Sequence, residues 1–163
     1  MGASACLLLE NRVNDIVDPA TRSRMMAGIR SGDTKPEKLL RKALHSLGFR
    51  YRLHVPSLLG RPDLVFPKYH AVLFVHGCFW HGHDCPLFRM PGTRKDFWEN
   101  KLRRNRERDI EVRKILLATG WRLGIVWECT LKGKKKIGLE KTVSRIVEWL
   151  ESDRPEFETG CAA

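Results

Sequence analysis

One segment decides how this 163-residue sequence is interpreted: Ala71-Val-Leu-Phe-Val-His76-Gly-Cys-Phe-Trp-His81-Gly-His-Asp-Cys85. Residues 71–75 are apolar and include β-branched valines, which is typical of a buried β-strand. A loop rich in glycine, histidine and cysteine follows directly. The sequence therefore predicts a buried strand that delivers a group of metal-ligating and titratable side chains to its carboxyl end.

The elements around this strand predict an α/β domain. Thr34 and Glu37 form a capping box that opens a helix, and Gly48 ends it. We expect further strands at 64–66 and 121–127 and helices at 98–119 and 142–151. The order α-β-β-α-β-α predicts a single domain with one sheet flanked by helices.

The two ends of the chain are expected to lie outside this domain. Residues 1–17 show no clean period and are interpreted as a flexible extension, and the domain itself is placed at 18–151. The acidic segment 152–163 is expected to be a mobile tail.

Residues 18–30 carry Arg22, Arg24 and Arg30 with methionines among them. This pattern fits a basic arm that contacts DNA, and it fits equally well a short helix that packs against the body of the domain.

Composition narrows the class of partner. Thirty Lys and Arg against 19 Asp and Glu give a net charge of +11, which favours a polyanion such as nucleic acid over other partners. A merely basic surface is the alternative reading. No apolar run approaches the roughly 20 residues of a membrane helix, and no signal peptide is recognisable, so we expect a cytoplasmic protein without a membrane partner.

The cysteines point to metal binding. Five is an odd number, and a chain without an export signal is a poor candidate for a disulfide framework. Cys78, His83 and Cys85 can surround a tetrahedral ion, and Cys129 follows a neighbouring predicted strand and can complete the set. Three thiolates and one imidazole form a closed structural zinc site. Reduced core cysteines beside a solvent-exposed histidine are the alternative.

Two histidines and one aspartate remain for chemistry. His76 and His81 flank the first cysteine, and imidazole exchanges protons near neutral pH. Asp63, in Gly60-Arg-Pro-Asp63, begins a buried strand, where a carboxylate requires a cation. A carboxylate that holds Mg²⁺ next to a phosphodiester favours hydrolysis.

Aromatic side chains accompany these groups. Phe79, Trp80 and Trp98 lie beside basic and titratable residues in segments predicted to be loops or helix starts. Such rings stack on bases or wedge between them, or they close a core beneath the metal loop.

Together these motifs resemble one family, the very short patch repair (Vsr) endonucleases. The resemblance runs from about Thr21 to Trp149. Its motifs are Ala20-Thr-Arg-Ser, Gly60-Arg-Pro-Asp63, His76-Gly-Cys-Phe-Trp-His81, Thr93-Arg-x-x-Phe-Trp98 and Ile125-Val-Trp-Glu-Cys129.

The resemblance implies a restriction-endonuclease-like α/β fold with a central mixed sheet flanked by helices, and a Mg²⁺-dependent activity. Members nick one DNA strand on the 5′ side of the thymine in a T:G mismatch, which arises by deamination of 5-methylcytosine. It further implies a bacterial, nucleoid-associated protein that acts as a monomer on double-stranded DNA, with mismatch-repair proteins as possible partners.

Residue by residue, the resemblance assigns roles to matching positions. Asp63 and the backbone carbonyl of Val75 correspond to ligands of two Mg²⁺ ions. The other implied roles are water activation for His81, a second active-site histidine for His76, a supporting carboxylate for Glu37, and ligands of one structural zinc ion for Cys78, His83, Cys85 and Cys129. Phe79, Trp80 and Trp98 match an aromatic wedge in the major groove, and Met26, in the arm with Arg22 and Arg24, matches a minor-groove contact.

The sequence departs from this pattern in three places. Val75 stands where the best-known members have threonine, the histidine run of the loop is interrupted by Gly82 and Asp84, and the extension before Asp18 has no counterpart in the family pattern. A restriction-type endonuclease on matched DNA and a non-catalytic, zinc-stabilised mismatch-binding module are the alternatives. The combination of Asp63 with His76 and His81 argues against mere binding.

Overall fold

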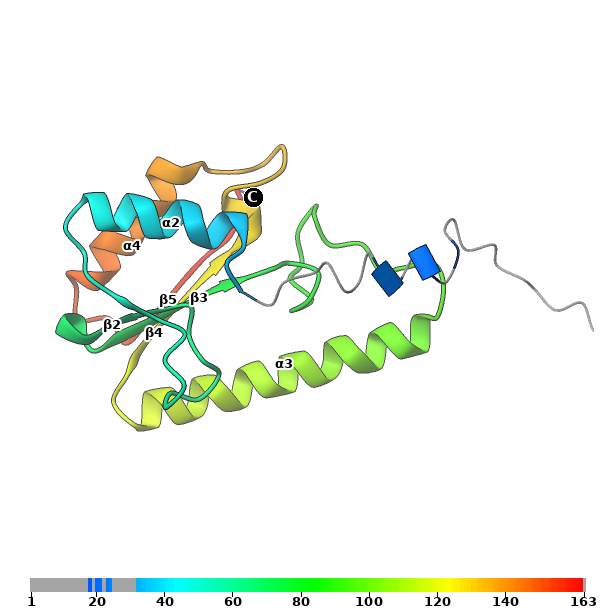
Figure 1. The fold of residues 1–163 in the computed structure, drawn as a ribbon, viewed down its shortest axis with the longest axis horizontal. Coiled ribbons are helices and arrows are strands. Elements are labelled where there is room, and N and C mark those ends of the chain that lie inside the picture. The colour runs from blue at the N-terminus through cyan, green and yellow to red at the C-terminus, as the bar shows by residue number, and fades with distance from the viewer. Residues whose placement is uncertain (1–17, 19, 22, 25–31, 163) are drawn as a thin grey trace, which may run out of the picture.

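The structure is a computed structural model that describes residues 18, 20–21, 23–24 and 32–162 (Figure 1). The expectations for residues 1–17, Arg22 and Met26 therefore lie outside the described residues. The elements in chain order are α2 (Lys35–Ser46), β1 (Arg52–Leu53), β2 (Leu64–Phe66), β3 (Ala71–His76), α3 (Lys95–Ala118), β4 (Arg122–Trp127), α4 (Leu139–Leu150) and β5 (Glu156–Thr159), with short 3₁₀ turns at Pro67–Tyr69 and Glu128–Thr130.

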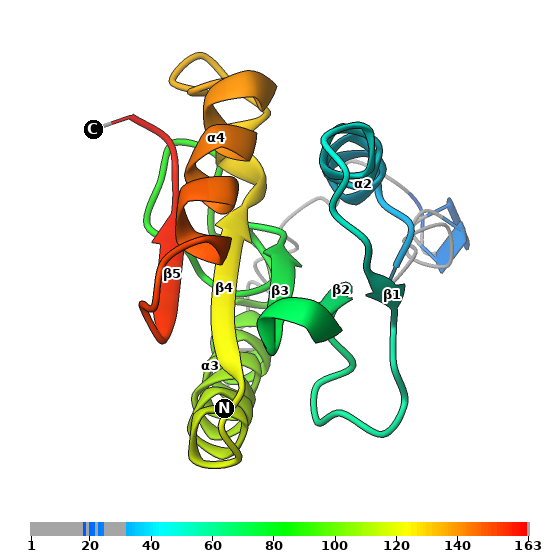
Figure 2. The same ribbon diagram turned by 90° about the vertical axis from the view of Figure 1, so that its left-hand side faces the viewer.

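The five strands form one mixed sheet in the order β1-β2-β3-β4-β5. The first three strands pair antiparallel, whereas β3 with β4 and β4 with β5 pair parallel. Helices α2 and α4 cover one face, and α3 covers the other (Figures 1 and 2). The predicted α/β class with a mixed sheet is confirmed.

Each face of the sheet has its own hydrophobic core. The core on the α2 and α4 side includes Leu40, Leu73 and Trp149, all without exposed surface. The core on the α3 side includes Phe74 and Val112. Alternation along β3 and β4 sends successive side chains to opposite cores. His76 and Trp127, paired at the ends of these strands, consequently share the α3 side.

Helix α2 forms as its cap predicts. Thr34 Oγ1 accepts the Glu37 amide, and the Glu37 side chain accepts the Thr34 amide, so both halves of the capping box are present. The buried face of α2 carries Leu40 and Leu44, which have no exposed surface, whereas Leu39 is 47% and Leu47 59% exposed.

The C-terminal segment differs from the expected mobile tail. Glu156–Thr159 form β5, which adds to the edge of the sheet beside β4. Phe157 stacks on Trp149 with ring centroids 5.4 Å apart, and Thr159 is 3% exposed. The alternating acids that suggested a solvated tail lie on one face of this strand, and its apolar and hydroxyl groups pack on the other. The short strand β1 was likewise absent from the predicted elements.

Gly124 in β4 marks the tightest packing of the sheet against α4. A Cβ atom there would lie 2.6 Å from Leu73 Cδ1 and 2.8 Å from Trp149 Cζ3. Gly124→Ala is therefore expected to lower the free energy of unfolding by about 1–3 kcal/mol, measured by urea denaturation. Gly92→Ala is the control, since a Cβ at Gly92 meets no atom within 4 Å. Equal stability of the two variants would contradict this packing.

Candidate active site

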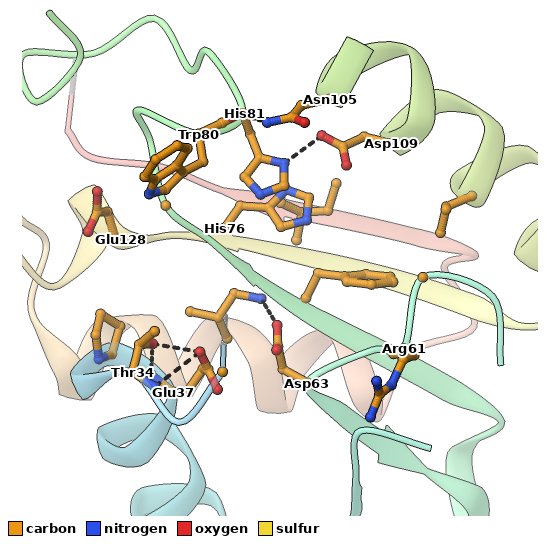
Figure 3. A pocket seen from close by; sticks show the side chains of 18 of the residues that line it. Thr34, Glu37, Arg61, Asp63, His76, Trp80, His81, Asn105, Asp109 and Glu128 are labelled. Carbon is orange, nitrogen blue, oxygen red and sulfur yellow. Dashed lines mark hydrogen bonds and ion pairs between the residues drawn. The ribbon is translucent and has the colours of Figure 1, made fainter. Parts of the chain in front are cut away.

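A pocket of about 930 Å³ opens at the carboxyl end of β3, between the start of α2 and the middle of α3 (Figure 3). The segment around Gly60 and Arg61 forms a further wall. The pocket lining includes every residue predicted for catalysis or Mg²⁺ binding and two of the three predicted aromatic residues, namely Glu37, Asp63, Val75, His76, His81, Phe79 and Trp80. Residues distant in sequence thus meet at one point of the fold.

Asp63 enters the pocket just before β2. Its Oδ2 accepts the Val75 amide at 2.7 Å, and its Oδ1 lies 3.8 Å from Nδ1 of His54. Burial raises the pKa of Asp63 to about 6, and the nearby Glu37 charge adds to this effect. The Val75 amide and His54 act in the opposite direction. The buried carboxylate is therefore a group that a cation would stabilise.

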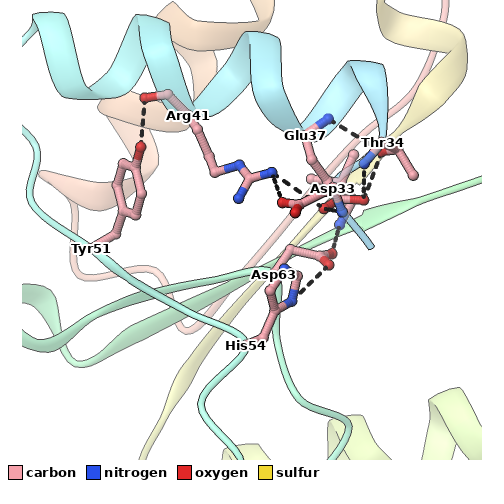
Figure 4. Close-up of polar contacts among 8 residues, drawn as sticks. Asp33, Thr34, Glu37, Arg41, Tyr51, His54 and Asp63 are labelled. Atoms are coloured by element: carbon pink, nitrogen blue, oxygen red, sulfur yellow. Dashed lines mark hydrogen bonds and ion pairs between the residues drawn. The ribbon is translucent and has the colours of Figure 1, made fainter. Parts of the chain in front are cut away.

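Glu37 is held rigidly beside Asp63 (Figure 4). It is 3% exposed, and its oxygens accept the Asp33 amide at 2.8 Å and the Thr34 hydroxyl at 2.6 Å. Arg41, 9% exposed, pairs with Asp33 and lies 4.0 Å from Glu37. The structure thus gives Glu37 the capping role, and the same carboxylate acts on Asp63 through its charge.

His76 and His81 stack face to face on the other side of the pocket. Their ring centroids are 3.7 Å apart and the planes differ by 4°. Burial, followed by the proximity of His81, lowers the pKa of His76 to about 3, although the Asp109 carboxylate opposes the shift. His76 is therefore neutral near pH 7. Within the described part of the chain its Nδ1 has no hydrogen-bond partner.

Asp109 is a site residue that the sequence analysis missed. It projects from α3, and its Oδ2 lies 2.5 Å from Nδ1 of His81. With Nδ1–H donated to this carboxylate, Nε2 of His81 is left to accept a proton. One turn earlier on α3, Asn105 Nδ2 donates to the Trp80 carbonyl at 2.8 Å. That i, i+4 pair on a basic helix was the signal available in the sequence.

The stacking of the two histidines bears on metal binding. His76, His81 and Asp109 each offer a ligand atom within 4.8 Å of the others. Imidazole ligands point their lone pairs in the ring plane, and two parallel planes share no point. The arrangement consequently suits proton exchange better than a shared metal ion.

A second group of ligand atoms lies beyond His81. Cys78, His83, Cys85 and Cys129 each offer one atom, all within 4.8 Å of one another. His83 Nδ1 lies 3.6 Å from Cys129 Sγ, which also accepts the Cys161 amide at 3.2 Å. Burial raises the pKa of Cys78 and raises that of Cys129 to about 12. Neutral thiols are thus favoured unless a cation is bound, and four converging donors can hold one.

The three expected aromatic side chains form one cluster at the rim of the pocket. Phe79 lies 5.1 Å from Trp80 and 5.2 Å from Trp98, measured between ring centroids. All three are half-buried, so they are neither core residues nor free in solvent. Lys101 Nζ lies 5.4 Å from the Trp80 ring. Trp98 is not among the residues that line the pocket, but it packs against Phe79 and Trp80, which do line it.

Positive charge surrounds this site. Helix α3 has Leu102, Val112 and Leu116 as its buried residues, and its exposed surface carries Lys95, Arg103, Arg104, Arg106, Arg108 and Lys114. Arg24 is also exposed, and its guanidinium donates to Thr21 Oγ1 at 3.1 Å. No helix among the described residues is both long and apolar enough to span a bilayer.

The sequence is similar to those of known proteins. A family model described as DNA mismatch endonuclease Vsr matches residues 14–87. The chain is 48% identical over 119 residues to the Type II nicking enzyme V.XorIIP of Xanthomonas oryzae pv. oryzae, covering 73% of this chain and 88% of the relative. It is 45% identical over 122 residues to the Type II nicking enzyme V.NmeAIP of Neisseria meningitidis, covering 75% and 87%.

The match to a third relative spans most of both sequences. The DNA mismatch endonuclease Vsr of Escherichia coli K12 is 46% identical over 136 residues, which cover 83% of this chain and 87% of the relative. Since this identity extends over most of both sequences, the chain belongs to the Vsr family of DNA mismatch endonucleases.

Proposed function

We propose that this nuclease nicks one DNA strand on the 5′ side of the thymine in a T:G mismatch, in a reaction that requires Mg²⁺. One observation supports the proposal above all others. A buried carboxylate, Asp63, faces the stacked His76–His81 pair across one pocket whose rim carries half-buried aromatic rings. Family membership and relatives named as nicking enzymes favour this reaction over mere binding.

Asp63 and the carbonyl of Val75 are the proposed Mg²⁺ ligands. Oxygen donors suit this hard cation, and the buried Asp63 carboxylate gains a counter-charge by binding it. The bound metal supplies Lewis acidity, which offsets the charge that develops on the phosphoryl group. Asp63 and the Val75 carbonyl would hold the metal, whereas the nearby Glu37 stays committed to the cap of α2.

His81 is the proposed general base. Asp109 orients its ring and stabilises the imidazolium that forms when Nε2 takes a proton from the attacking water. The new oxygen–phosphorus bond forms as the bond to the 3′ oxygen breaks, and that oxygen leaves with a proton from solvent. Because His76 is buried and neutral, it adds no second positive charge beside the imidazolium of His81.

The aromatic cluster is the proposed reader of the mismatch. A T:G pair costs less to open or unstack than a matched pair, because its hydrogen bonds are already displaced. Half-buried rings of Phe79, Trp80 and Trp98 present apolar surface beside the cation of Lys101. This combination suits insertion between bases next to a phosphate backbone. We further propose that the protein acts as a monomer in the bacterial cytoplasm, at the nucleoid.

The Cys78, His83, Cys85 and Cys129 cluster is the proposed zinc site. Four converging soft donors, three of them thiols, match the ligand set of a closed structural zinc site. The site joins the loop after β3 to the turn after β4. It thereby fixes the loop that carries Phe79, Trp80 and His81.

A strand-specific nicking assay tests the activity. With Mg²⁺ present, a T:G duplex is expected to receive a single nick 5′ of the thymine, and C:A and matched duplexes to remain intact. Asp63→Asn should lower the rate by at least ~10³-fold while leaving duplex binding unchanged, because it removes the metal-binding charge. Asp153→Asn, a change at an exposed residue, is the control. Cleavage of matched DNA would favour the restriction-type alternative, and binding without cleavage would favour the non-catalytic module.

The same Asp63→Asn variant is expected to be more stable than the wild type at pH 8 without added Mg²⁺. The folded-state pKa of about 6 lies above the ordinary 3.8, so the wild type loses stability as pH rises from about 4 to 6. The variant avoids this loss and keeps an acceptor for the Val75 amide. Urea denaturation should show a gain of roughly 2–3 kcal/mol at pH 8 and almost none at pH 3.5. A gain that does not depend on pH would argue against a destabilising carboxylate.

Loss of one cluster ligand tests the zinc site. Cys85→Ala is expected to abolish zinc binding and to reduce stability by ~4 kcal/mol or more, measured by metal analysis and thermal melting. Cys161→Ala is the matched control, since Cys161 contacts the cluster through its amide and is outside the ligand set. Full zinc content with an unchanged melting temperature in Cys85→Ala would refute the assignment.

A further inference from the structure

Trp127 is the one side chain that contacts both the metal-ligand cluster and the histidine pair, as far as the described ring pairs extend. Its indole stacks on His83 with centroids 4.1 Å apart and planes 8° apart. It also lies edge to face against both histidines of the pair. The ring centroids are 5.3 Å apart for His76 and 6.2 Å apart for His81, and the interplanar angle is 70° in each case. The ring is 8% exposed and lies directly opposite His76 in the β3–β4 register.

The orientation of His76 depends on these ring contacts. Its Nδ1 has no hydrogen-bond partner among the described residues, so no polar contact at that atom fixes the imidazole plane. Phe74 at 5.6 Å, Trp127 and His81 enclose the ring instead. His81 has Asp109 as a polar anchor, but its stacked partner has none at Nδ1. A rotation of Trp127 would therefore be transmitted to the pair through His76.

Glu158 fixes Trp127 in turn. The indole Nε1–H donates to Glu158 Oε1 at 2.7 Å, a charge-assisted hydrogen bond between β4 and β5. Glu158 pairs with Ile125, two residues before Trp127, so the carboxylate reaches the indole diagonally along the sheet. Glu158 is an exposed residue. Packing of an indole does not require such a partner, whereas fixing its rotation does.

We propose that Trp127, held by Glu158, is a positioning residue for the His76–His81 pair. The proposal rests on the function proposed above for that pair. Glu158, on the edge strand β5, thus influences the orientation of the general base His81 without contacting it directly. Small misorientations of reacting groups can cost ~10²-fold in rate without weakening substrate binding.

Steady-state nicking of T:G duplex by five variants, one of them a control, tests the proposal. Glu158→Leu and Trp127→Phe both remove the indole–carboxylate bond, and each is expected to lower kcat at least tenfold with KM changed less than twofold. Their double variant should lower kcat no further, because both changes break the same bond. Glu158→Gln keeps an acceptor and should stay within threefold of wild type. Glu151→Leu, the same change at an exposed residue after α4, is the control.

Zinc content, melting temperature and the NMR shifts of the imidazole Cε1–H protons accompany the kinetics. Retained zinc and an unchanged melting temperature, with shifted His76 and His81 signals in Glu158→Leu, support positioning. Unchanged kcat, unmoved signals, or a loss of kcat that follows zinc loss or unfolding would each overturn it. Absence of nicking by the wild type would refute the proposed function. In that case the NMR signals alone decide whether Glu158 holds the indole against the pair.

Discussion

The parallel pairing of β3 with β4 is the interaction on which the rest of the site depends. Its register sets His76 opposite Trp127 and sends both side chains to the α3 side of the sheet. The two chain segments that leave these strands then start side by side, which brings Cys78 near Cys129. A shift of one residue would turn every side chain of one strand to the opposite core. The pairing of β3 with β4 therefore positions both the pocket and the cysteine cluster.

The sheet also explains why a carboxylate can be buried where it is useful. Asp63 precedes β2 and satisfies the amide of Val75, a position that β2 has already left unpaired. The hydrogen bond orients the carboxylate, yet burial still raises its pKa. Folding thus tolerates an unfavourable charge at the centre of the pocket, which is common where binding energy is later gained from a ligand.

Local signals in the sequence predicted much of the fold. The capping box of Thr34 and Glu37 located the start of α2, and the apolar run before His76 located β3. Asp63, His76 and His81 were identified by residue type and spacing, and the structure brings them into one pocket. By contrast, the contacts of Trp127 and Glu158 arise only from tertiary pairing, and the i, i+4 spacing of Asn105 and Asp109 does not say which side chain Asp109 meets. Glu156-Phe-Glu-Thr159 has too few apolar residues to indicate a strand, and β4 supplies the partner that makes it one.

The cysteine cluster draws on two distant segments, and this has a consequence during protein synthesis. Cys78, His83 and Cys85 leave the ribosome together, but 46 positions separate His83 from Cys129. At ordinary translation speeds of 5–20 residues per second, the nascent chain carries the first three ligands for roughly 2–10 s before the fourth is added. A three-ligand metal site keeps an open, exchangeable position. If this cluster holds the proposed metal ion, an ion captured in that interval would stay replaceable until β4 docks beside β3 and Cys129 completes the set.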